Sequence, residues 1–89
     1  MEQNKISELR TELVDIMLGF IEEKKSLEEL LNKNAEIRSK YNGKLPKDIN
    51  EVVNKLYQLS RNMKGSTKKQ LSREAIIFII DDLLMHLTN

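Results

Sequence analysis

The spacing of the apolar residues constrains this chain most, because they recur three and four positions apart in four separate segments. That spacing places them on one face of an α-helix, whereas a half-buried strand would alternate apolar and polar residues. Short amphipathic helices are marginal alone and need partners that cover the apolar face. The four stripes are Ile6, Leu9, Leu13, Ile16, Met17 and Phe20; Leu27, Leu30, Leu31, Asn34, Ile37 and Tyr41; Ile49, Val52, Val53, Leu56, Tyr57 and Leu59; and Ile76, Ile79, Ile80, Leu83, Leu84 and Leu87.

Turn and capping signals separate the stripes. Ser26 and Glu29 have the spacing of a capping box at a helix start. This favours a tight turn at residues 23–26, although the absence of Gly and Pro there leaves one long, kinked helix as an alternative. The segment Asn42 to Pro46 interrupts the pattern, since Asn-Gly suits a helix C-terminus and Pro suits the first turn of the next helix.

Two more capping signals lie further along the chain. Asp48 and Glu51 could form a capping pair for the third helix, and Ser72 could cap the fourth. We therefore expect an all-α protein with helices near residues 4–22, 26–42, 47–64 and 72–88. With short links between them, these helices predict an antiparallel four-helix bundle that forms a single domain over residues 1–89.

Composition excludes several kinds of site. The 89 residues contain no Cys and one His, so disulfides, thiol nucleophiles and Cys- or His-rich metal sites are not available. No phosphate-binding Gly loop or catalytic His-Glu motif is present. No apolar stretch reaches the roughly 18 residues of a membrane span, and the N-terminus does not have the pattern of a signal peptide. We expect a cytoplasmic protein without cofactor, metal or small-molecule substrate.

The basic residues concentrate in the middle of the chain. Residues 44–73 carry eight bases and two acids, a net charge of +6. No acid lies between Val52 and Arg73, a segment that contains Lys55, Arg61, Lys64, Lys68, Lys69 and Arg73. Such a basic surface could attract an anionic lipid headgroup or an acidic protein face, and the alternative is a solvated helix end and loop. Nucleic acid is not expected as a partner, because the last helix would present acids to the phosphates and Tyr57 is the only aromatic residue near the bases.

The last helix carries an unusual pair of apolar residues. A helical step of 100° per residue places Phe78 and Met85 opposite the core stripe, one above the other. Asp81 and Asp82 lie between them, and these two acids point about 100° apart, so they do not converge on one metal or proton. Asp82 and His86 could form an i, i+4 ion pair. Because exposed apolar residues tend to mark partner surfaces, we predict a binding surface at Phe78, Asp81, Asp82 and Met85; the alternative is a deeper helix that buries both sides.

The whole chain resembles the small cytosolic proteins of the enterocin A immunity type, which protect bacteria against class II (pediocin-like) bacteriocins. The shared features are the size, the absence of Cys, an acidic and Leu-rich first pair of helices, a third helix with an aromatic residue (Ile49 to Tyr57), and a basic loop before a final helix (Leu71 to Leu87). The resemblance implies an antiparallel four-helix bundle without enzymatic activity. It also implies that the protein acts from the cytoplasmic side on the bacteriocin's membrane receptor, the mannose phosphotransferase permease, and prevents lethal pore opening.

In that family the C-terminal half recognises which bacteriocin is neutralised. The resemblance thus predicts a bacteriocin immunity protein whose partner is the permease with bound bacteriocin, with peripheral contact at the inner face of the membrane as a further expectation. A generic helical interaction module, such as an antitoxin or regulatory subunit, is the alternative. A weaker one is a helical chorismate mutase, since Leu9-Arg10 is similar to the start of those enzymes. They need a second Arg eighteen residues after the Leu, and that position is Leu27 here.

Overall fold

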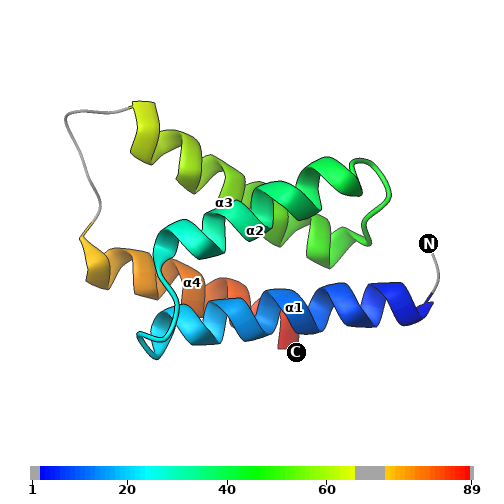
Figure 1. Cartoon of the computed structure of the whole chain (residues 1–89), viewed down its shortest axis with the longest axis horizontal. Coiled ribbons are helices and arrows are strands. Elements are labelled where there is room, and N and C mark those ends of the chain that lie inside the picture. The colour runs from blue at the N-terminus through cyan, green and yellow to red at the C-terminus, as the bar shows by residue number, and fades with distance from the viewer. Residues whose placement is uncertain (1–2, 66–71, 89) are drawn as a thin grey trace.

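Four helices make up the part of the chain that the structure describes (Figure 1). The computed structural model describes residues 3–65 and 72–88, with side chains described for 3–62 and 72–88. The helices are α1 (Gln3–Ile21), α2 (Leu27–Lys40), α3 (Lys47–Gly65) and α4 (Arg73–Thr88). Each helix runs opposite to the one before it, and α4 also packs against α1, which closes the ring. The predicted antiparallel four-helix bundle is confirmed.

The tight turn between α1 and α2 is confirmed, and its backbone forms a Schellman motif. The amide of Glu23 donates to the carbonyl of Phe20 (3.1 Å), and the amide of Lys24 donates to the carbonyl of Gly19 (2.8 Å). Glu23 takes the left-handed conformation that this motif requires (φ 65°), a position that glycine usually fills. The capping box then starts α2: Ser26 N donates to Glu29 Oε2 (2.8 Å) and Glu29 N donates to Ser26 Oγ (3.1 Å).

The second turn follows the predicted Asn-Gly signal, but α2 ends at Lys40, two residues earlier than expected. Tyr41 caps it, and the amide of Lys44 donates to the carbonyl of Tyr41 (2.9 Å) to form a turn. Gly43 has φ 76° in this turn, which an L side chain would rarely adopt. At the start of α4, Ser72 Oγ accepts a hydrogen bond from the amide of Ala75 (3.2 Å), as its predicted capping role requires.

The core lies where the four apolar stripes meet. Its buried apolar residues are Leu9, Leu13, Met17, Phe20, Leu30, Ile37, Ile49, Val52, Val53, Leu56, Leu59, Ile76, Ile80, Leu83, Leu84 and Leu87. Asn34 is buried among them and donates from Nδ2 to the carbonyl of Val53 (3.0 Å), while its Oδ1 has no hydrogen-bond partner among the residues that the structure describes. Tyr57 belongs to the predicted third stripe but is only half-buried, and the Arg38 guanidinium lies over its ring at 3.7 Å.

Candidate functional site

The outward face of α4 carries the two most exposed large apolar side chains that the structure describes. Phe78 is 77% exposed and Met85 is 54% exposed, whereas Leu18 of α1 follows at 39%. The predicted exposure of Phe78 and Met85 is therefore confirmed, and the alternative of a deeper helix is wrong. Both residues lie opposite the buried stripe of α4, and what they bind remains a prediction.

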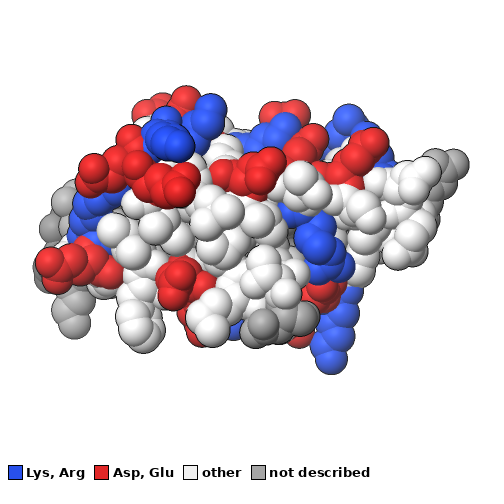
Figure 2. Space-filling view, turned by 90° about the horizontal axis from the view of Figure 1, so that it is seen from below, with Lys and Arg blue, Asp and Glu red and all other residues white. Residues whose placement is uncertain are grey.

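Three carboxylates surround this apolar pair. Asp81 and Asp82 are exposed between Phe78 and Met85, as expected, and Glu74 is exposed one helical turn before Phe78. We call these five residues the α4 surface: Glu74, Phe78, Asp81, Asp82 and Met85. Figure 2 shows the face of the bundle that lies lowest in Figure 1, and acidic side chains alternate with uncharged ones along its lower left margin. The sequence pattern already contained Glu74 at the i−4 position of Phe78, although we had not predicted it.

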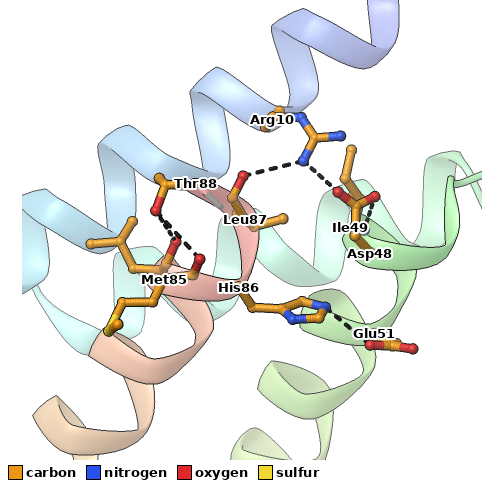
Figure 3. A network of polar contacts seen from close by, with 9 residues as sticks. Arg10, Asp48, Ile49, Glu51, Met85, His86, Leu87 and Thr88 are labelled. Atoms are coloured by element: carbon orange, nitrogen blue, oxygen red, sulfur yellow. Dashed lines mark hydrogen bonds and ion pairs between the residues drawn. The ribbon is translucent and has the colours of Figure 1, made fainter.

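A shallow groove between α3 and α4 borders the α4 surface. Lys55 of α3 and Asp82, Leu83, Met85 and His86 of α4 line this groove. His86 Nε2 lies 3.0 Å from Glu51 Oε2 of α3, so the predicted pairing of His86 with Asp82 is wrong (Figure 3). His86 pairs with Glu51 on the neighbouring helix and not with Asp82 on its own helix. The position of the neighbouring helix cannot be read from the spacing of residues within α4.

Arg10 of α1 fixes the C-terminal end of α4. Its Nη1 donates to Asp48 Oδ2 at the start of α3 and to the carbonyl of Leu87 in the last turn of α4 (3.3 Å), so one guanidinium of α1 contacts two other helices (Figure 3). The hydrogen bond from Arg10 lowers the pKa of the Asp48 carboxyl below its ordinary value of 3.8. Asp48 also accepts from the amide of Ile49 (2.9 Å), while Glu51 contacts His86. The predicted capping pair of Asp48 and Glu51 is therefore wrong.

Arg73 fixes the other end of α4. Its guanidinium lies over the Phe20 ring at 4.8 Å and donates to the carbonyl of Phe20 (3.3 Å), close to the C-terminal end of α1. Glu23 in the following turn lies 3.8 Å from the same guanidinium. A cation near a helix C-terminus is favourable because the carbonyls there carry partial negative charge. Contacts at both ends thus hold α4 against α1 and present its outer face to solvent.

The basic surface stays a prediction, and those of its residues that the structure describes make different contacts. Lys55 lies in the groove beside α4, and Arg73 contacts α1. Arg61 lies 5.9 Å from the Tyr57 ring, which Arg38 of α2 contacts at 3.7 Å. The side chains of Lys64, Lys68 and Lys69 lie outside the described residues. Arg38 joins Arg61 through tertiary packing, and no sequence signal predicted this.

In residues 3–65 and 72–88, no group of three or more His, Asp or Glu residues could hold a metal ion. Within the same residues, no helix has the length and hydropathy that crossing a bilayer requires. No protein-family model, curated protein or solved structure matches the chain.

Proposed function

We propose that this protein is a bacteriocin immunity protein of the enterocin A immunity type, without enzymatic activity. It acts from the cytoplasmic side on the mannose phosphotransferase permease with bound bacteriocin. The observation that carries the proposal is the exposure of Phe78 and Met85 on α4. Two further points support it: the chain is an antiparallel four-helix bundle, the fold that the resemblance implies, and α4 belongs to the C-terminal half that this family uses for recognition.

The shape of the α4 surface favours a protein partner. A single helix face is convex, whereas sites for small molecules are concave and bury most of their ligand. Large apolar side chains such as Phe78 and Met85 supply much of the binding energy where proteins meet, because a few central residues dominate most interfaces. Their exposure in the isolated chain fits a protein that functions in a complex.

The same surface also supports a second candidate, a helical interaction module such as an antitoxin or regulatory subunit. That candidate needs a partner protein but no bacteriocin and no permease. An assay of protection therefore separates the two, since only an immunity protein changes the survival of cells exposed to a bacteriocin.

The test is expression of the intact chain in a bacteriocin-sensitive strain, followed by challenge with a panel of class II bacteriocins. We expect a raised inhibitory concentration for one or a few members of the panel. The variant Phe78→Ala/Met85→Ala should lose this protection while it keeps its thermal stability. The matched control is Leu18→Ala, which removes an exposed apolar side chain from α1 and should protect normally. Sensitivity to every bacteriocin despite normal expression would contradict the immunity function.

A further inference from the structure

We infer that the α4 surface docks a basic amphipathic helix of its partner protein, with apolar residues of that helix on Phe78 and Met85 and its Lys or Arg residues beside the three carboxylates. The inference rests on the proposed function in one respect, the use of this surface for docking. It adds the chemistry of the partner, which neither the fold nor the resemblance supplies.

The spacing of the apolar pair fits a helix as the docked element. Phe78 and Met85 are two helical turns apart, which at 1.5 Å per residue is about 10 Å along α4. A second helix that lies along α4 presents its own apolar side chains at the same repeat, as in helix-in-groove recognition. The shallow groove beside Met85, between α3 and α4, gives this helix a second wall.

The charge of the α4 surface selects a basic partner. Glu74, Asp81 and Asp82 are all exposed, and the chain carries no Lys or Arg from residue 74 to residue 89. Two described cations lie beside this surface: Arg73 at the start of α4 contacts Glu23 and Phe20, and Lys55 lies on the α3 side of the groove. Opposite charge across an interface speeds encounter and suppresses partners of like charge.

The same charges disfavour two other occupants of this surface. A second copy of the chain docked face to face would bring Asp81 and Asp82 against their own counterparts, and like charges at close range are repulsive. The anionic inner leaflet of a membrane attracts basic segments and would repel these carboxylates. Self-association and lipid binding are therefore results that would count against the inference.

The experiment uses the full chain and a labelled 18-residue model peptide as the probe. The peptide is built on a seven-residue repeat, with Leu at the first, fourth and fifth positions of each repeat and Lys at the other positions. One control peptide replaces every Lys with Glu, and a second keeps the composition but breaks the apolar stripe. We expect fluorescence anisotropy to show binding of the basic amphipathic peptide alone, with an affinity that falls as salt rises, because exposed charge pairs are screened.

Variants then locate the binding site. Phe78→Ala/Met85→Ala should weaken binding at least tenfold, since it removes both apolar contacts. Asp81→Asn/Asp82→Asn should weaken binding at least threefold and reduce its salt dependence, because it removes two charges and keeps the shape. Both variants should retain the helical circular dichroism spectrum and melting temperature of the parent.

Two control variants change similar residues elsewhere. Leu18→Ala removes exposed apolar area from α1, and Asp15→Asn/Glu28→Gln removes two exposed acids from α1 and α2. Both should bind the basic peptide like the parent. If they weaken binding as much as the α4 variants do, the peptide is recognising acidic protein in general and the inference is overturned.

Three other results would overturn it as well. The first is equal binding of the acidic peptide. The second is dimerisation of the chain, seen in sedimentation and abolished in the Phe78→Ala/Met85→Ala variant. The third is binding to phosphatidylcholine–phosphatidylglycerol vesicles that the same variant abolishes.

The experiments distinguish failure of the proposed function from failure of this inference. Peptide binding at α4 without protection from any bacteriocin removes the immunity function and supports the inference. Protection that depends on Phe78 and Met85, without peptide binding, removes the inference alone.

Discussion

Replacing Arg10 should destabilise the bundle through the contacts that its guanidinium makes with two other helices. We choose Arg10→Met, because Met retains an apolar stem of similar reach and removes the charge and all donors. The lost interactions are the ion pair with Asp48 at the start of α3 and the hydrogen bond to the carbonyl of Leu87 in α4. The Asp48 carboxylate stays partly satisfied, since the amide of Ile49 still donates to it.

The magnitude follows from the exposure of the ion pair. Hydrogen bonds to charged groups contribute about 1.5–3 kcal/mol when buried, whereas exposed ion pairs contribute about 0.2–1 kcal/mol. The side chains of Arg10 and Asp48 are each 36% exposed, so solvent screens part of the interaction. We therefore expect a coupling free energy of about 1 kcal/mol between Arg10 and Asp48. For a chain of this size, 1 kcal/mol corresponds to a lowering of the melting temperature by about 4–8 °C.

The coupling should depend on pH with a defined sign. Arg10 lowers the pKa of Asp48 in the folded state, while the unfolded chain has the ordinary value of 3.8. The unfolded state therefore takes up the proton first as the pH falls. The stabilisation is complete well above 3.8, and it is lost as the pH falls from there through the lower pKa of the folded state. The coupling measured at pH 7 should be reduced at about pH 3.

The assay is a double-mutant cycle of Arg10→Met and Asp48→Asn, with unfolding in urea followed by circular dichroism at both pH values. The matched control is Lys5→Met with Glu8→Gln, because Lys5 and Glu8 form an exposed pair on α1 (3.6 Å) whose coupling should be much weaker, since solvent screens exposed ion pairs. A coupling between Arg10 and Asp48 no larger than this control, or one that persists unchanged at pH 3, would refute the reasoning.

Three further predictions concern the stability of the fold, each measured as the free energy of unfolding in urea. Asn34→Leu should leave stability nearly unchanged, because it keeps a similar volume and removes a buried oxygen for which the described residues supply no partner, which offsets the loss of the Nδ2 hydrogen bond to Val53; a loss above about 2 kcal/mol would show that this oxygen is satisfied in solution. Glu23→Gly should stabilise the turn after α1 by about 0.5–1 kcal/mol relative to Glu23→Ala, since glycine adopts φ 65° without strain. Leu56→Ala should cost about 2–5 kcal/mol whereas Phe78→Ala should cost less than about 0.5 kcal/mol, because Leu56 is fully buried and Phe78 is 77% exposed; similar losses for both would contradict the exposure of Phe78.

The fold was predictable because its determinants are local. Apolar periodicity defined each helix face, the Ser26–Glu29 capping box defined the start of α2, and the Asn-Gly pair defined the turn before α3. The exposure of Phe78 and Met85 also followed from the helical repeat alone, once the core stripe of α4 was known. Burial in a bundle depends on angle around the helix axis, and residue number fixes that angle.

The polar contacts between helices were not predictable, because they depend on how the helices are placed. His86 was expected to pair with Asp82 within α4, and it pairs instead with Glu51 of α3. Asp48 was expected to act as a local cap, and it accepts from Arg10, 38 positions earlier in the chain. In each case a local partner and a distant partner had comparable chemistry. Only the packing of α3 against its neighbours decides which of the two is in reach.

The charged residues that hold α4 in the bundle differ from those that it exposes to solvent. Arg10 of α1 contacts the last turn of α4, and Arg73 in the first turn of α4 contacts α1, whereas no Lys or Arg follows residue 73. Asp81 and Asp82 are exposed near the middle of the helix, where a substitution usually changes the stability of the fold by less than about 0.5 kcal/mol. Neutralising them is therefore expected to leave the stability of the fold nearly unchanged. Substituting an exposed residue that contributes little to folding should affect binding alone. The α4 carboxylates therefore test docking more directly than a buried residue would.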